Sequence, residues 1–205
     1  MTEVIDLGEV VDLVFPLSGS TIASDYALYL WQSLRRVAPW LEDEPNAGIM
    51  PITGVSSGDG VLYLGQRAQL TLRLPIERLG EADALCGLQL DLDGAVRIGR
   101  ARQRGLRPGP AQYSPLVTMG CTVEEDFVAA CGERLEKMEV AARLICGRAR
   151  TIRGEAGEVS GFSLMLHGLT PAHALRLQTT GLGDGRKLGC GIFVPHKTAT
   201  AVGAA

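Results

Sequence analysis

The stretch GLGDGRKLGCG runs from Gly181 to Gly191 and contains two units in which glycines flank one hydrophobic residue. Glycine has no Cβ, so it adopts positive φ readily and lets backbone N–H groups approach a ligand closely. The five residues between the two units include two cations. N–H groups and cations gathered in one loop predict a cradle for phosphates. The residues that we expect to form it are Gly181, Gly183, Arg186, Lys187, Gly189 and Gly191.

The residues after this loop exclude the common nucleotide-binding loops. Ile192 to Val194 predict a short strand that Pro195 ends, so no helix follows the glycines. A Walker loop needs Gly-Lys-Ser/Thr ahead of a helix, and the dinucleotide fingerprint needs a glycine where Arg186 stands. The alternative is a flexible loop between two strands, without a ligand.

Composition indicates an ordinary globular protein. The chain has 205 residues, of which 46% are hydrophobic and 21% charged, enough for one large domain or two of about 100 residues. No apolar run reaches the ~18 residues that span a bilayer, and the acidic N-terminus does not resemble a signal peptide. We therefore expect a cytoplasmic protein that does not contact a membrane.

The cysteines indicate reduced thiols and no metal centre. They are odd in number and form no C-x-x-C pair: Cys86, Cys121, Cys131, Cys146 and Cys190. The nearest Cys/His pair, Cys190 and His196, has no further partners at zinc spacing. We expect neither a metal nor another cofactor.

The charges are distributed unequally along the chain. Residues 1–95 hold 5 Lys+Arg and 14 Asp+Glu, a net charge of −9, whereas residues 96–205 hold 15 and 9, a net charge of +6; together they give −3. An asymmetry of this kind suggests that one part of the protein meets a polyanion. Seventeen of the 20 cations are arginines, which suit bidentate contacts with phosphate. Chance is the simpler alternative.

Hydrophobic periodicity predicts two α+β halves. The first half reads as strand, helix, two strands, short helix and strand, at residues 10–17, 24–38, 48–55, 61–64 with 70–74, 76–85 and 88–92. The second half repeats the order less regularly, with strands near 96–106, 116–119, 141–152, 161–166 and 192–194 and helices at 123–138 and 171–180. This is the ferredoxin-like pattern, so we expect two tandem ferredoxin-like domains, 1–95 and 96–205, and a disordered tail.

Three segments carry a resemblance to a known family: Val14 to Leu34, Ala47 to Gly54, and Leu177 to Lys197. The Gly181–Gly191 loop resembles the C-terminal glycine-rich signature of the RAMP proteins. The wider pattern, with its Pro195-His196-Lys197 ending, resembles the CRISPR pre-crRNA-processing endoribonucleases of the subtype first described in myxobacteria. The resemblance covers nearly the whole chain and is diffuse in the middle.

This resemblance implies a tandem ferredoxin-like protein that binds the stem-loop of a CRISPR repeat RNA and cleaves it without a metal. It implies attack of a ribose 2′-OH on its own phosphate, which leaves a 2′,3′-cyclic phosphate. Such a reaction needs a base, an acid, and cations or N–H donors around the charged phosphorane. The resemblance also implies that the protein stays on the crRNA beside other subunits of an effector complex.

The expected general base departs from the family pattern. The family usually reads Asp-His-Gly where this chain reads Asp25-Tyr26-Ala27, which places Tyr26 at the position of the histidine. A free phenol with a pKa near 10 is about one part in a thousand ionised at pH 7. Tyr26 could act as a weak base, orient the 2′-OH, donate a proton, or simply pack on the sheet.

Other candidates for the chemistry lie in the second half. His196 matches the family ending and is the second candidate for acid or base, while Lys197 and Lys187 are candidates for stabilising the phosphorane. The two remaining histidines, His167 and His173, are expected to be structural or surface residues.

Recognition of RNA should depend on arginines, because aromatic residues are only 5% of the chain and stacking needs them. The expected cluster is Arg143, Arg148, Arg150 and Arg153, in which strand spacing puts Arg148 and Arg150 on one face. The second cluster is Arg97 to Arg107. Two other functions stay open: an inactive subunit that binds the crRNA hairpin, and an assembly module whose glycine loop packs on a neighbouring subunit.

Overall fold

The computed structural model of the chain describes residues 9–197, and the chain divides into two compact units after Gly105. The predicted boundary at residue 95 falls ten residues too early. The reason is that the strands β8 (Ala95–Ile98) and β9 (Arg102–Gly105) both pair with β1 (Val10–Ser18) of the first unit. The predicted disorder of residues 198–205 lies outside the described residues. Within residues 9–197, no helix is long and apolar enough to cross a membrane.

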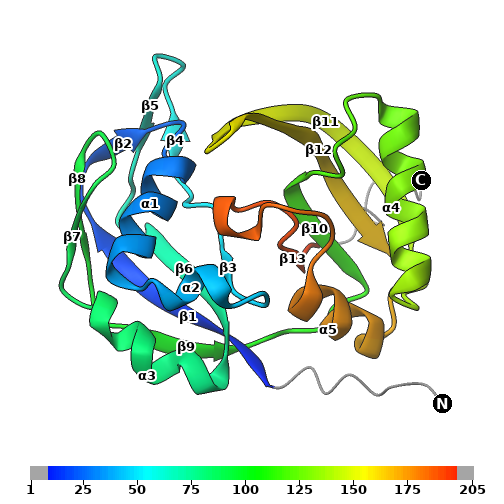
Figure 1. The fold of residues 1–205 in the computed structure, drawn as a ribbon, viewed down its shortest axis with the longest axis horizontal. Helices are drawn as coiled ribbons and strands as arrows, with labels where there is room; N and C mark the ends of the chain where they lie inside the picture. Colours follow the sequence, from blue (N-terminus) through cyan, green and yellow to red (C-terminus); the bar gives the residue numbers. More distant parts are fainter. Residues whose placement is uncertain (1–8, 198–205) are drawn as a thin grey trace, which may run out of the picture. The chain divides into compact units, whose positions relative to one another are not determined.

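The first unit is built on β1, whose strand neighbours change along its length (Figure 1). Its first part pairs with β9, its last two residues pair with β8, and β6 pairs along nearly all of it. The order β3–β6–β1–β9 is the ferredoxin-like order, and β8 with β7 forms an added hairpin. The three strands not yet delimited are β3 (Gly48–Ile49), β6 (Gln69–Pro75) and β7 (Gln89–Asp91).

The strand β1 supplies much of the core of this unit, and burial alternates along it only from Phe15 onward. Its odd-numbered side chains include Leu13, Phe15 and Leu17, which are buried and lie beside the buried leucines of β6. The remaining elements are α1 (Ala27–Val37), α2 (Trp40–Asp43), α3 (Leu79–Ala82), and a small sheet of β2 (Thr21–Ala23), β5 (Val61–Tyr63) and β4 (Val55–Ser56). Short 3-10 turns at Ile76–Arg78 and Asp83–Leu85 flank α3, which accounts for the helix predicted at 76–85.

The second unit has the ferredoxin-like strand order without additions. Its sheet runs β11–β12–β10–β13, so the first and last strands in sequence are neighbours in space. The elements are β10 (Ala111–Val117), α4 (Glu124–Lys137), β11 (Arg143–Gly154), β12 (Gly157–His167), α5 (Pro171–Thr180) and β13 (Val194–Pro195). The predicted α+β class with two tandem ferredoxin-like domains is confirmed.

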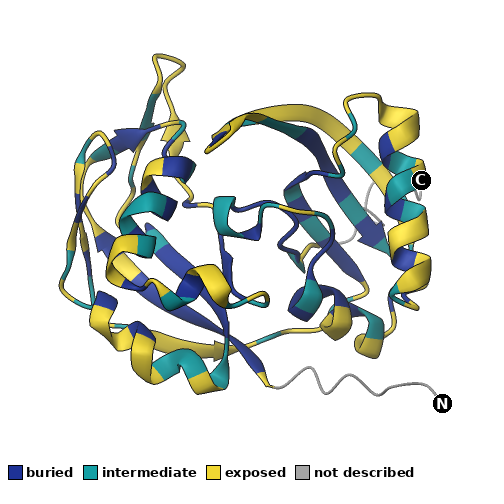
Figure 2. Cartoon of the chain, in the orientation of Figure 1, coloured by how far each residue is buried: buried dark blue, intermediate teal, exposed yellow. Residues whose placement is uncertain are grey.

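Both helices of the second unit cover the same face of its sheet. Phe127, Cys131 and Leu135 of α4 and Leu177 of α5 share one core with Phe162, Leu164 and Leu166 of β12. Side chains that alternate with these point to the opposite side, which we call the outer face. Burial along β11 alternates accordingly over its first residues, and much of this strand is exposed (Figure 2).

The strand β10 begins earlier than predicted because its pattern is unusual. Gln112 and Ser114 are fully buried and pair with Leu166 and Leu164, so polar side chains occupy the core side of this strand. Their polarity conceals the alternation from a hydrophobic scan. The predicted helix 171–180 is found at the same residues, and Thr170 caps it by accepting the N–H of His173 at 3.2 Å.

Candidate nucleic-acid interface

The outer face of the second sheet brings two histidines and an arginine into one row. Cross-strand partners share a face of a sheet. Arg143 pairs with His167, His167 pairs with Ala111, and the backbone N–H of His196 donates to the carbonyl of Ala111 at 3.0 Å. The next row on this face holds Tyr113, whose ring lies 5.5 Å from the ring of His196. Residues from three strands and from the segment after β13 therefore share this face.

His196 is held in one tautomer by its surroundings. Its Nδ1 lies 2.8 Å from the carbonyl oxygen of Lys197, and a carbonyl can only accept a hydrogen bond. The hydrogen of the neutral ring is therefore on Nδ1, which leaves Nε2 with the lone pair. His196 and Lys197 are both exposed, so the basic nitrogen and the ammonium group are accessible from solvent.

The four predicted arginines do not lie on one face. Arg150 pairs with Gly161 and Arg143 with His167, two odd-numbered residues of β12, so both arginines lie on the outer face. Arg153 pairs with Glu158 and lies on the opposite face. Arg148 lies in a β-bulge between Cys146 and Ala149, where two residues oppose one. All four are exposed, but the predicted cluster is split by the register of the sheet.

The glycine-rich loop directs several of its N–H groups into the protein. The N–H of Gly191 donates to Leu116, that of Asp184 to Thr118, and that of Leu182 to Gly191, at 2.8 to 3.1 Å. Two of these bonds hold the loop on the end of β10 or the residue after it. These three N–H groups donate to carbonyls of the protein itself. They therefore do not face a ligand, contrary to what we predicted for the loop.

The glycines are required because the loop is tightly packed. Gly181, Gly183, Gly185, Gly189 and Gly191 all have positive φ. A Cβ on Gly183 would lie 2.2 Å from the carbonyl oxygen of Thr118, and one on Gly191 would lie 2.2 Å from that of Leu182. Such distances are prohibited, so the loop needs glycine for its own packing.

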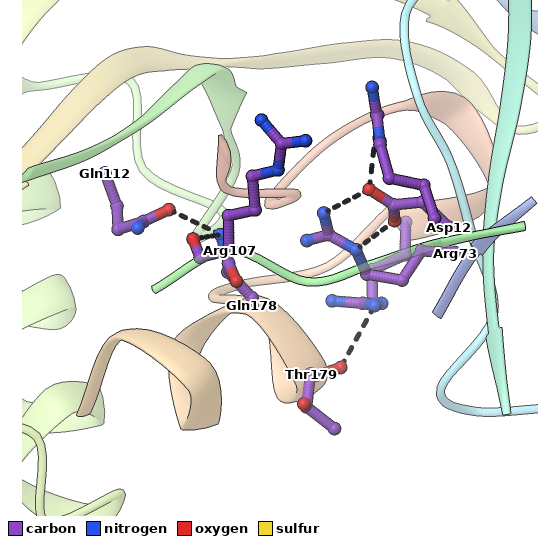
Figure 3. A network of polar contacts seen from close by, with 8 residues as sticks. Asp12, Arg73, Arg107, Gln112, Gln178 and Thr179 are labelled. Carbon is purple, nitrogen blue, oxygen red and sulfur yellow. Dashed lines mark hydrogen bonds and ion pairs between the residues drawn. The ribbon is translucent and has the colours of Figure 1, made fainter. Parts of the chain in front are cut away.

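Arg186 is buried inside this loop and does not face solvent. It is 8% exposed, and its Nη2 donates to the carbonyl of Thr179 at 3.2 Å (Figure 3). A Cβ on Gly181 would lie 2.0 Å from its Nη1. We predicted that Arg186 presents its charge to RNA, but in this structure the side chain is buried and joins the loop to the end of α5. Lys187 is half-buried.

A second buried polar contact fixes the start of the same unit. Nε2 of Gln178 in α5 donates to Oε1 of Gln112 at 3.0 Å and to the carbonyl of Arg107 at 3.1 Å (Figure 3). Gln178 therefore joins α5 to β10 and to the chain before it. Gln112 was not expected at a buried position.

Tyr26 is a buried residue of the first unit. Its hydroxyl donates to the carbonyl of Ile52 at 3.1 Å and also accepts the N–H of Ile52. Burial raises the pKa of Tyr26 to about 12, although the backbone contact with Ile52 lowers it in part. About one phenol in 10⁵ is then ionised at pH 7. The geometry favours the packing alternative, in which Tyr26 fixes the segment around Ile52 to the start of α1.

Sequence reasoning missed two residues of the outer face. Tyr113 was not considered, and His167 was treated as structural. The available signal was weak, since both are single residues within strands and only strand pairing sets them beside His196. Among residues 9–197, no three His, Cys, Asp or Glu side chains lie close enough to hold a metal ion.

Comparison with known proteins agrees with the fold and with the RAMP signature. The family model described as Cas6 Crispr matches residues 11–198. A CRISPR-associated endonuclease Cas6 from Myxococcus xanthus (strain DK1622) is 38% identical over 194 residues, which cover 94% of this chain and 84% of that protein.

Solved structures show the same fold at low identity. A CRISPR-associated protein Cas6 superposes with a TM-score of 0.68 and 11% identity, over 92% of this chain and 100% of that one. A RAMP protein described as binding different RNA substrates superposes with a TM-score of 0.66 and 12% identity, over 90% of this chain and 98% of that one.

Proposed function

Because the chain belongs to the Cas6 family of CRISPR-associated proteins, we propose that it is an endoribonuclease that processes CRISPR repeat RNA. In this proposal it binds the repeat stem-loop, cuts by attack of a 2′-OH without a metal, and stays on the mature crRNA in an effector complex. The endonuclease activity named for the Myxococcus relative and the RNA binding named for the RAMP neighbour support it.

The observation that carries the proposal is the composition of the outer face. His196 exposes a basic Nε2 on the same face as two exposed guanidinium groups, those of Arg143 and Arg150. Cleavage by a neighbouring 2′-OH requires a base that accepts the proton of the 2′-OH and cations that bind the phosphates, and this face supplies both. The arginines would bind phosphates of the stem, and Lys197 would stabilise the extra charge of the phosphorane.

The chemical step uses only groups of the RNA and these side chains. Nε2 of His196 takes the proton of the ribose 2′-OH as the 2′-oxygen forms a bond to phosphorus. The bond from phosphorus to the 5′-oxygen breaks, and that oxygen takes a proton from water or from the ammonium group of Lys197. The products are a 2′,3′-cyclic phosphate and a 5′-hydroxyl.

Incubation of a repeat RNA with the protein in EDTA tests the proposal. We expect cutting at one position, with a cyclic phosphate on the upstream fragment. A single 2′-deoxy substitution at that position should abolish cutting and spare binding, because only the nucleophile is lost. Cutting that persists with the deoxy substrate would contradict the mechanism. Co-elution of product RNA with the protein tests retention.

One observation favours a second function, that of an inactive subunit that binds the hairpin. The position at which the family carries its histidine holds Tyr26, which is buried and has a raised pKa. If His196 does not replace that histidine, the protein binds its repeat RNA without cutting it. Binding of the hairpin without any cleaved product would establish this function.

A further inference from the structure

Four arginines gather on β8, β9 and the turn between them, in a unit that is otherwise acidic. Residues 1–105 hold 9 Lys+Arg and 14 Asp+Glu, a net charge of −5, and without these four the net charge is −9. The stretch 95–105 contains no carboxylate. All four side chains are exposed: Arg97, Arg100, Arg102 and Arg104. The charge asymmetry seen in the sequence thus has a second centre, within the first unit.

Strand pairing places three of these arginines on one face. Arg97 pairs with Ser18, Arg102 with Val14 and Arg104 with Asp12. These partners are even-numbered residues of β1, so their side chains point away from the core face of Leu13 and Phe15. We call Arg97, Arg102 and Arg104 the arginine row.

The charge of the row is not cancelled within the protein. The carboxylate of Asp12 is bound at 2.8 Å by the buried Arg73, and Arg104 contacts the same carboxylate at 3.5 Å (Figure 3). One carboxylate thus serves two guanidinium groups. In the part of the chain that the structure describes, Arg97, Arg100 and Arg102 form no ion pair with a carboxylate.

The face that carries the row suits a phosphate backbone better than nucleobases. The residues of β1 on this face are Val10, Asp12, Val14, Pro16 and Ser18, and their partners on β6 are Pro75, Arg73, Thr71 and Gln69. None of them is aromatic, so bases find no ring on this face on which to stack. Val10, Asp12, Val14, Thr71 and Arg73 are also buried, so RNA reaches this face at the exposed guanidinium groups of the row along its edge. Successive arginines of β9 on this face are about 6.8 Å apart along one strand, which forms a single file of guanidinium groups.

We propose that the arginine row binds the backbone of unpaired RNA that flanks the repeat stem-loop. This inference rests on the proposed function, in which the stem-loop itself occupies the outer face of the second unit. The remaining RNA of the precursor is a flexible single strand, and its phosphates can follow a single file of cations. Binding by the row is independent of base sequence, because only phosphates are contacted.

Affinity measurements with two RNAs test this inference: the stem-loop alone, and the stem-loop with an unpaired extension of about ten nucleotides. The wild-type protein should bind the extended RNA more tightly, by about the same factor for two unrelated extension sequences. Arg102→Ala should reduce this gain, and Arg97→Ala/Arg102→Ala should reduce it further, with about one unit of salt dependence lost for each arginine. Affinity for the stem-loop alone should not change.

The matched control is Arg36→Ala, which removes an exposed arginine of α1 from the same unit. An extension that adds no affinity to the wild type, or an Arg102→Ala variant that behaves as Arg36→Ala does, would overturn the inference. Failure of the proposed function looks different. In that case the wild type neither binds nor cuts the stem-loop, while an unpaired strand is still bound through Arg97 and Arg102.

Discussion

At the scale of single residues, the tautomer of His196 has the largest consequence. The contact of Nδ1 with the Lys197 carbonyl turns Nε2 into the only basic nitrogen of the neutral ring. A histidine that directly follows a two-residue strand therefore has an orientation that suits proton abstraction. The sequence indicated the residue through the family ending, but the orientation depends on a backbone turn that only the fold defines.

We expect His196→Ala to slow cleavage by about 10²- to 10⁴-fold, the usual contribution of a general base. Affinity for the RNA should remain, because the arginines of the outer face are intact. Single-turnover cleavage and equilibrium binding of a 2′-deoxy substrate measure the two effects separately. An unchanged cleavage rate would remove His196 from the mechanism.

Tyr26 should show itself in stability rather than in cleavage. Tyr26→Phe leaves the buried carbonyl and N–H of Ile52 without the hydroxyl, a loss of about 1–3 kcal/mol in the free energy of unfolding. The cleavage rate of the folded variant should equal that of the wild type. A large loss of cleavage with normal stability would restore Tyr26 as a catalytic residue.

The raised pKa of Tyr26 also predicts a dependence on pH. The folded value of about 12 lies above the unfolded value near 10, so the unfolded state loses its proton first. This contribution is complete below pH 10 and disappears as the pH rises from 10 to 12. Urea unfolding at pH 8 and at pH 11.5 should therefore show the difference between wild type and Tyr26→Phe shrinking by about 2 kcal/mol. A constant difference would contradict the assigned burial.

At the scale of elements, the glycine-rich loop is a part of the fold that happens to carry a family signature. Its sequence predicted positive φ correctly, and the structure has positive φ at five of its glycines. The direction of its N–H groups could not be predicted. It depends on the carbonyls of Leu116 and Thr118, which lie more than sixty residues earlier in the chain.

Gly183→Ala and Gly168→Ala separate the two reasons for a glycine. Both residues have a φ of +77°, but a Cβ on Gly168 meets nothing within 4 Å, whereas one on Gly183 meets the Thr118 carbonyl. We expect Gly168→Ala to cost about 1 kcal/mol and Gly183→Ala to cost about 1–3 kcal/mol more. Equal melting temperatures would show that the loop yields easily and that its glycines serve another purpose.

The strand β11 offers a matched pair of arginine variants. Arg143→Ala/Arg150→Ala removes two cations from the outer face, and the dependence of stem-loop binding on salt should fall by about two units. Arg153→Ala removes one from the opposite face and should leave binding nearly unchanged. If Arg153→Ala weakened binding more than the double variant does, the RNA would lie on the face opposite to the outer face.

At the scale of the whole molecule, the sequence predicted the architecture better than its boundaries. The period of the hydrophobic pattern, together with the glycines between elements, identified most strands and both helices of the second unit. The domain boundary failed because β8 and β9 look like the start of a new repeat, and only their pairing with β1 assigns them to the first. The split of the arginines failed for a related reason, since a single bulge in β11 shifts which residues share a face.

The corrected boundary predicts how fragments behave. A fragment of residues 1–105 should melt cooperatively, whereas a fragment of residues 1–95 loses β9 and most of β8 and should be destabilised by several kcal/mol or remain unfolded. Thermal melts followed by circular dichroism measure this. Equally cooperative melting of the two fragments would show that β8 and β9 are dispensable.

The position of β13 has a consequence for biosynthesis. This strand is made about eighty residues after its neighbour β10, and His196, to which we assign proton transfer, directly follows it. During translation, Arg143 and Arg150 are therefore added to the chain well before His196. The residues to which we assign RNA binding are therefore synthesised before the residue to which we assign cleavage. Chains that end before Val194, released from the ribosome, should bind the repeat RNA without cutting it, and cutting by such chains would refute this order.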